Sequence, residues 1–276
     1  MAIFLPGSAH FLAGQRRTGV CWFFALFLLP NLWAFPASAP GVGPFYITIV
    51  LSVIGILLFV LLLISSWRPT RRMGCLGWLL FVGTILLMGK VVNEPCKRLH
   101  KTYVGEAFVI NGAAMAPTMI VPSESAPEVL RPDRVVASKW LYRVSDPKRG
   151  DIVIHNATNK DGLPTIWTHR VVGLPGETVD IEPPYVLING ERLTEPPIFA
   201  KISARKDGFS GYCRAEEVGG EGVSLPLTLG SDEYFLLGDN SPHSLDSRFV
   251  GPVLRQNITG RIIRIYFPLD RIRELE

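Results

Sequence analysis

Three short blocks of this 276-residue chain combine glycine, proline and small polar residues in a way that favours a chemical site. They read G-A-A-M-A-P-T at residues 112–118, H-R-V-V-G-L-P-G-E at 169–177 and G-D-N-S-P-H-S-L-D-S-R at 238–248. Histidine, present here as His169, has an unperturbed pKa that lets it exchange a proton near neutral pH. Each block also has a structural interpretation: Met115 in a core, Pro117 in a turn, and Asp246 with Arg248 as an ion pair that fixes a loop. The three blocks together are harder to explain by structure alone.

The blocks resemble the conserved boxes of the type I signal peptidases, and they occur in the same order. Those enzymes carry the boxes G-x-S-M-x-P-T, D-R-V, R-G-D, K-R-V-V-G-L-P-G-D and G-D-N-x-x-x-S-x-D-S-R. This chain has D-R-V-V at 133–136 and K-R-G-D-I-V at 148–153 for the second and third boxes, so the resemblance covers roughly residues 108–268. It implies a membrane-bound serine peptidase that removes signal peptides from exported proteins, without a cofactor or a metal ion.

The resemblance places the nucleophile at Ala114 and the general base at His169, where the family usually has serine and lysine. Histidine is acceptable as a base because imidazole works near neutral pH without burial, and the endoplasmic-reticulum branch of the family has histidine there. Its other ring nitrogen then needs a partner, which Asp246 or Asp239 could supply. Ser244 matches a family serine that orients the base. The remaining residues carried over as binding or structural are Gly112, Met115, Pro117, Thr118, Asp239 and Arg248.

Ala114 is the more serious departure, because a methyl group cannot attack a carbonyl. Loss of the nucleophile in a serine peptidase costs about 10⁶ in rate. Ala114 could be an engineered knock-out, but His169 is a second change in the same pair, which favours natural divergence. Another nucleophile could come from Thr118, from Ser123 or Ser125, or from a water molecule activated by His169.

Three hypotheses for function follow. The first is a working signal peptidase that cleaves exported precursors. The second is an inactive pseudopeptidase that binds signal-peptide-like segments or regulates a partner peptidase. The third is a structural β domain without a peptide groove, which is disfavoured by the retained residues Met115, Pro117, Asp246, Ser247 and Arg248.

The N-terminal part of the chain predicts a membrane anchor. Residues 18–67 contain no Asp, Glu, Lys or Arg, which a soluble domain does not tolerate over such a length. A proline- and glycine-rich turn at 36–44 divides this stretch, so we expect spans near residues 18–35 and 45–66. A third span near residues 73–90 is shorter, and a buried or interfacial helix is the alternative. A cleaved signal peptide over the first apolar segment is disfavoured, because the second apolar segment would remain.

The distribution of basic residues predicts the orientation of these spans. Arginines precede the first span and follow the second, while the loop between them is uncharged. With three spans, the C-terminal part then lies on the outer side of the plasma (inner) membrane. Lys90, Lys97, Arg98 and Lys101 disagree with this orientation, but long domains cross largely regardless of charge. The basic excess of the chain lies in the anchor, so a nucleic-acid partner is not expected.

From residue 102 onward the pattern predicts a mainly β domain with antiparallel strands. Short runs rich in Val, Ile, Tyr and Phe predict strands at 107–110, 134–138, 151–155, 167–172, 178–181, 185–188, 233–237 and 260–267. Asn189 and Gly190 predict a tight hairpin turn. Insertions are expected near 121–132 and 200–229, so the domains are 1–101 and 102–276. Cys96 and Cys213 would share the outer compartment, where a disulfide could persist.

Overall fold

The computed structural model describes residues 98, 101–102, 104–122, 131–158 and 162–275. The predicted spans near 18–35, 45–66 and 73–90 lie outside these residues. Within them, no helix has the length and apolar character needed to cross a membrane. The chain divides into two compact units, Met1–Gly105 and Glu106–Glu276, and the second unit holds the three motif blocks.

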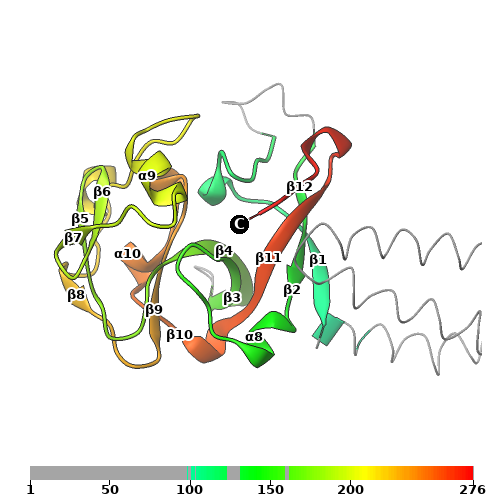
Figure 1. The fold of residues 1–276 in the computed structure, drawn as a ribbon, viewed down its shortest axis with the longest axis horizontal. Helices are drawn as coiled ribbons and strands as arrows, with labels where there is room; N and C mark the ends of the chain where they lie inside the picture. Colours follow the sequence, from blue (N-terminus) through cyan, green and yellow to red (C-terminus); the bar gives the residue numbers. More distant parts are fainter. Residues whose placement is uncertain (1–97, 99–100, 103, 123–130, 159–161, 276) are drawn as a thin grey trace, which may run out of the picture. The chain divides into compact units, whose positions relative to one another are not determined.

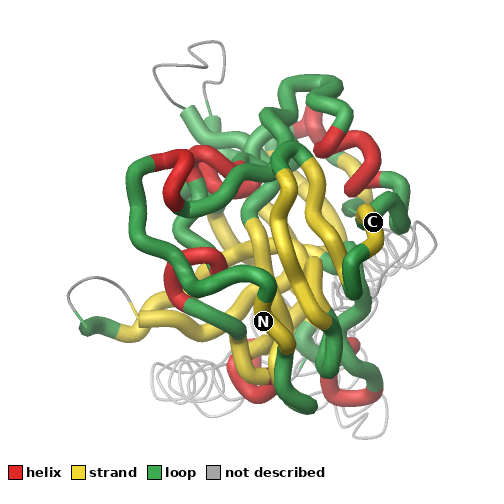
Figure 2. Tube along the Cα trace, turned by 90° about the vertical axis from the view of Figure 1, so that its left-hand side faces the viewer, coloured by secondary structure: helices red, strands yellow, loops and turns green. Residues whose placement is uncertain are grey.

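An eight-stranded antiparallel sheet forms the centre of the second unit. Its strand order is β1-β2-β11-β3-β4-β9-β10, and β12 pairs with β11. Figure 1 shows β11 as a long strand beside β2, and Figure 2 shows that strands dominate over short helices. The strands of this sheet are β1 (Gly105–Val109), β2 (Arg134–Ser138), β3 (Ile152–Thr158), β4 (Pro164–Gly173), β9 (Glu233–Leu237), β10 (Val253–Leu254), β11 (Ile258–Phe267) and β12 (Arg273–Glu274).

A second, four-stranded sheet has the order β7-β6-β5-β8. It contains β5 (Thr178–Glu182), β6 (Tyr185–Ile188), β7 (Glu191–Arg192) and β8 (Leu227–Thr228). The predicted hairpin turn is confirmed, because Asn189 and Gly190 both have positive φ and Ile188 pairs with Glu191. Residues 200–229, predicted as an insertion, run from α9 (Ile198–Ser203) to β8 and place Phe209 and Tyr212 in the core of this sheet.

The helices among the described residues of the second unit are short. They are α8 (Leu141–Val144), α9, α10 (Ser247–Val250) and the 3-10 turns η2 (Ala113–Met115), η3 (Glu216–Val218), η4 (Ser241–His243), η5 (Arg255–Asn257) and η6 (Leu269–Arg271). The turn η2 precedes the buried residues Thr118 and Met119, and Met115 and Met119 pack into one core cluster with Ile152 and Ile154 of β3. This packing fixes the first motif block against the large sheet.

The sheet positions the other two blocks on adjacent strands. In β4, His169 lies opposite Val153 of β3, and Arg170 lies opposite Leu237 of β9. The β9 strand ends at Leu237, so the third block begins directly where β9 meets the centre of β4. Residues far apart in the sequence therefore come together around His169.

Candidate functional site

A groove of about 420 Å³ runs between the first motif block and β4. One wall comes from the end of β1 and the segment that follows it, and the other comes from β4. Both Ala114 and His169 line this groove. The complete lining is Phe108, Val109, Ile110, Asn111, Gly112, Ala114, Met115, Ile166, Trp167, Thr168, His169 and Leu245. The structure thus brings together the two positions singled out by the motifs.

The imidazole of His169 pairs with a second buried histidine. His155 Nε2 lies 3.0 Å from His169 Nδ1, and the two side chains belong to residues that are 2% and 3% exposed. The pairing follows from the strand register, because His155 lies opposite Trp167, two residues before His169 on β4. Such diagonal neighbours share one face of the sheet and are within reach of long side chains. Trp167 packs edge-on against both rings, with interplanar angles of 86° to His155 and 84° to His169.

Burial keeps both imidazoles neutral at physiological pH. Loss of solvation lowers the pKa of His169 from 6.5 to about 4, and the charge of Arg248 adds to this effect, while Asp246 and Asp239 partly oppose it. Burial and the neighbouring His169 lower the pKa of His155 to about 3. A neutral imidazole in this position can accept a proton or donate a hydrogen bond, depending on its tautomer.

Gly238 brings Ala114 and Ser244 to the same point opposite His169. The register that pairs Arg170 with Leu237 places Gly238 across from His169, one residue further along. A Cβ atom on Gly238 would lie 2.2 Å from Ser244 Oγ and 2.5 Å from the carbonyl oxygen of Ala114. The Ser244 hydroxyl therefore occupies the space that a side chain of residue 238 would need. It is buried and has no hydrogen-bond partner among the described residues.

Asp239 ties the first block to β4 through a buried ion pair. Arg170 donates two hydrogen bonds to the carboxylate, with Nε to Oδ1 at 2.7 Å and Nη2 to Oδ2 at 2.6 Å. Thr118 Oγ1 donates to the same carboxylate at 2.5 Å. Because both Arg170 and Asp239 are almost completely buried, removal of either side chain would leave the other charge buried without a partner. The hydroxyl of Thr118 is held in this network.

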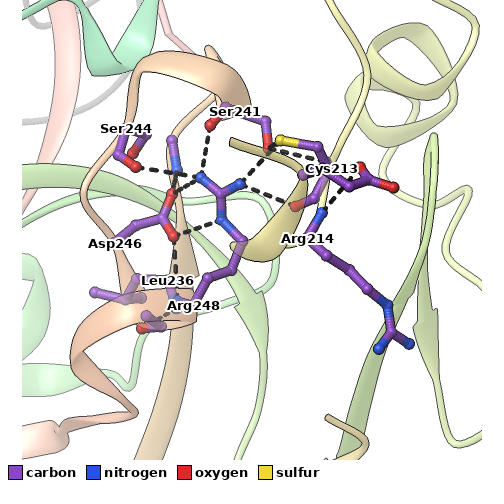
Figure 3. A network of polar contacts seen from close by, with 10 residues as sticks. Cys213, Arg214, Leu236, Ser241, Ser244, Asp246 and Arg248 are labelled. Atoms are coloured by element: carbon purple, nitrogen blue, oxygen red, sulfur yellow. Dashed lines mark hydrogen bonds and ion pairs between the residues drawn. The ribbon is translucent and has the colours of Figure 1, made fainter. Parts of the chain in front are cut away.

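A second buried ion pair holds the loop that carries Ser244. Arg248 donates to Asp246 from Nε at 2.8 Å and from Nη2 at 2.9 Å, and Gly238 N donates to Asp246 Oδ2 at 3.0 Å. The same guanidinium donates to the carbonyl oxygens of Ser241 and Cys213. Figure 3 shows the guanidinium of Arg248 surrounded by these partners. Cys213 forms no disulfide with any residue that the structure describes, and Cys96, its predicted partner, lies outside those residues.

The partner expected for the His169 ring is therefore not the one observed. The sequence predicts a carboxylate beside His169 from Asp246 or Asp239, but the hydrogen bonds of both carboxylates go to arginines and to neighbouring groups. His155 occupies that role instead. One feature of the sequence could have indicated this pairing: His155 and His169 are the only histidines between residues 101 and 242. Of the other expected positions, Gly112 and Met115 line the groove, Pro117 follows a cis peptide bond, and Ser123 and Ser125 lie outside the described residues.

The described residues contain no group of three or more His, Cys, Asp or Glu side chains that could hold a metal ion. The polar side chains that line the groove are those of Asn111, Thr168 and His169, so the titratable group available there is the neutral imidazole of His169.

Comparison with known proteins identifies the family. A family model described as "Signal peptidase, peptidase S26" matches residues 97–267, which is more than half of the chain. The chain belongs to the signal peptidase family. A signal peptidase I of Leptolyngbya laminosa is 34% identical over 180 residues, covering 63% of this chain and 75% of the relative. Signal peptidase I P of Bacillus subtilis subsp. natto is 30% identical over 176 residues, covering 63% and 84%.

A crystal structure of a signal peptidase I from Enterococcus faecalis is also similar in sequence. It is 31% identical and covers 43% of this chain and 97% of that chain, with a TM-score of 0.32. The membership in the signal peptidase family rests on the matches in sequence, and it accords with the order of the motif blocks around the groove.

Proposed function

We propose that this chain acts on the signal peptides of exported proteins, as a signal peptidase with His169 as its general base. The observation that supports this most directly is that Ala114 and His169 line one groove although 55 positions separate them in the sequence. The names of the relatives support the substrate, and the charge pattern of the N-terminal part supports an anchor that holds the β domain at the outer face of the membrane.

The shape of the groove suits an extended, apolar peptide segment. The end of β1 and the middle of β4 offer strand backbone on the two sides, which is the usual means of binding a peptide in extended form. Val109, Ile166 and Leu245 line it and are 46%, 48% and 41% exposed. Apolar side chains left open to solvent at a groove favour an apolar ligand.

The chemistry at position 114 is the open step in this proposal. A family enzyme would attack the scissile carbonyl with a serine hydroxyl, and Ala114 has none. Because Thr118 Oγ1 donates to Asp239, we take a water molecule as the attacking group for cleavage by this chain. His169 would take a proton from that water as its oxygen adds to the carbonyl carbon, and would return the proton to the amine that leaves. No covalent intermediate forms on this route.

The methyl group of Ala114 favours a second function, in which the groove binds signal peptides without cutting them. Recognition of an extended segment needs only strand edges and pockets, and these do not depend on a hydroxyl at residue 114. Such a pseudopeptidase would present or protect signal peptides, or regulate a partner peptidase.

Cleavage of a purified preprotein by the full chain in detergent micelles separates the two functions. The proteins compared are the wild type, His169→Ala, Ala114→Ser, and Lys201→Ala as a surface control. A peptidase gives slow cleavage by the wild type, unchanged cleavage by Lys201→Ala, none by His169→Ala, and a gain of several orders of magnitude in Ala114→Ser, since the nucleophile is worth about 10⁶ in rate.

Saturable binding of a signal peptide by the wild type without any cleavage would establish the second function in place of the first. Absence of both cleavage and binding in the wild type and in Ala114→Ser would refute both. The chain would then be a structural β domain of the same family.

A further inference from the structure

The contact between His155 and His169 places one hydrogen atom between two ring nitrogens. At 3.0 Å, His155 Nε2 and His169 Nδ1 are at hydrogen-bond distance, so one of them donates and the other accepts. Neither nitrogen can turn to water instead, because both residues are almost completely buried. The pair therefore exists as one of two tautomeric arrangements, and each arrangement gives His169 Nε2 a different chemistry.

The surroundings hold both rings in place. Trp167 meets His155 and His169 edge-on, with ring centroids 6.1 Å and 5.9 Å away. With Nδ1 of His169 held by His155, Nε2 is the nitrogen left to serve a molecule in the groove, which His169 lines. The position of His169 relative to His155 is thus set by the pairing of β3 with β4.

The role proposed for His169 selects one of the two tautomers. A general base needs an unprotonated nitrogen toward its substrate, so His169 Nε2 carries no hydrogen and Nδ1 carries one. His169 Nδ1 then donates to His155 Nε2, which accepts. His155 carries its own hydrogen on Nδ1, which is buried and has no hydrogen-bond partner among the described residues.

We propose that His155 is the positioning residue of this site, and that it holds His169 as the Nδ1–H tautomer with a free Nε2 toward the groove. The proposal rests on the proposed function in that His169 is the base whose nitrogen is being prepared. This role of His155 explains why the His169 ring needs no carboxylate beside it. Asp239 and Asp246 are bound to Arg170 and Arg248, so an uncharged acceptor takes their place.

A neutral acceptor also has a cost for the reaction. A carboxylate beside the ring would stabilise the imidazolium that forms when His169 takes up a proton. His155 orients the ring but contributes no negative charge, so His169 is a weaker base than in a histidine–aspartate pair. We therefore expect His155 to affect the rate of the chemical step and not the affinity for the peptide.

Nuclear magnetic resonance of the full chain in micelles tests the tautomer directly. With ¹⁵N-labelled histidine, two-bond nitrogen–proton correlations distinguish a protonated from an unprotonated ring nitrogen, and the five histidines are assigned by substitution. We expect His169 to show a protonated Nδ1 and an unprotonated Nε2. In His155→Phe, which keeps the ring shape without an acceptor, this pattern should be lost. In His155→Gln, whose amide oxygen can accept, it should be retained.

The same substitution at an exposed histidine, His243→Phe, is the matched control and should leave the His169 signals unchanged. A wild-type His169 with a protonated Nε2 would overturn the proposal. An unchanged His169 pattern in His155→Phe would overturn it as well.

A kinetic comparison in the Ala114→Ser background adds the functional readout. His155→Phe should lower kcat at least tenfold with KM unchanged, and His155→Gln should recover much of the loss. Equal rates with and without His155 would contradict a positioning role. If Ala114→Ser cleaves nothing, the peptidase proposal fails, while the tautomer measurement still decides the role of His155.

Discussion

At the scale of single residues, the neutral histidine pair makes stability depend on pH. The pKa of His169 falls to about 4 and that of His155 to about 3 in the folded protein, against 6.5 when unfolded. As pH drops below 6.5, the unfolded chain takes up protons first, so stability is complete above pH 6.5 and is lost progressively toward pH 4 and 3. At pH 5 the loss is about 2 kcal/mol for each ring.

Urea unfolding of the full chain at pH 7.5 and pH 5 measures this difference. His155→Phe should lose about half of the pH dependence, whereas His243→Phe should keep all of it. An unfolding free energy that is equal at the two pH values in the wild type would show that the two rings are not held neutral.

The motifs point to Ala114 and His169, which line one groove, but not to the partner of the His169 ring. Ala114, His169 and Asp239 lie in blocks whose composition stands out from the chain. His155 lies in an ordinary run of strand residues, and its contact with His169 depends on the register between β3 and β4. That register is set by the whole sheet, which a local pattern does not contain. The arginine partners of Asp239 and Asp246 could not be predicted for the same reason. The conformation of each loop determines which cation a carboxylate reaches.

At the scale of elements, Gly238 is where β9, the first block and the third block meet. Its backbone leaves no room for a Cβ atom beside Ser244 and the Ala114 carbonyl. Gly238→Ala should therefore push these segments apart and destabilise the protein by about 1–3 kcal/mol. It should also weaken signal-peptide binding, because Ala114 lines the groove.

Gly112→Ala provides the matched control for stability. Residue 112 has extended backbone with φ of −123°, and a Cβ atom there meets nothing within 4 Å. Thermal unfolding of the two variants should separate them clearly. Equal melting temperatures would mean that the loop around Ser244 can move away from Gly238 without cost.

Strand positions could be predicted well because short runs rich in Val, Ile, Tyr and Phe are bounded by turn-forming residues. The predicted ranges 134–138, 185–188 and 233–237 coincide with β2, β6 and β9. The two-residue strands β7, β8, β10 and β12 are too short to show a period. The structure of residues 200–229 was harder to predict, because their glycines and serines indicate a loop. In the structure, Phe209 and Tyr212 of this segment lie buried in the core beside the second sheet.

At the scale of the whole molecule, the proposed boundary near residue 102 can be tested by truncation. A chain of residues 102–276 keeps β1, the edge strand that pairs with β2, and the ion pair between Glu106 and Lys139 at 2.9 Å. It should fold, with a melting temperature within about 4 °C of that of the β domain in the full chain, as a change below about 1 kcal/mol implies.

A chain of residues 110–276 lacks β1 and with it Phe108 and Val109 of one groove wall, and should melt lower and bind signal peptide more weakly. Circular dichroism during heating distinguishes the two fragments. An unfolded 102–276 fragment would show that the β domain depends on the residues before it.

The two buried arginine–aspartate pairs also determine how the site responds to ionic strength. Added salt weakens attraction between charges that water and ions can reach, over a distance of about 8 Å at physiological concentration. The side chains of Arg170, Asp239, Arg248 and Asp246 are at most 2% exposed, whereas those of Lys201 and Asp207 are 44% and 71% exposed. Ions therefore screen the exposed pair of Lys201 and Asp207, and they hardly weaken the two buried arginine–aspartate pairs. We expect the groove to stay assembled in concentrated salt as it does in dilute buffer.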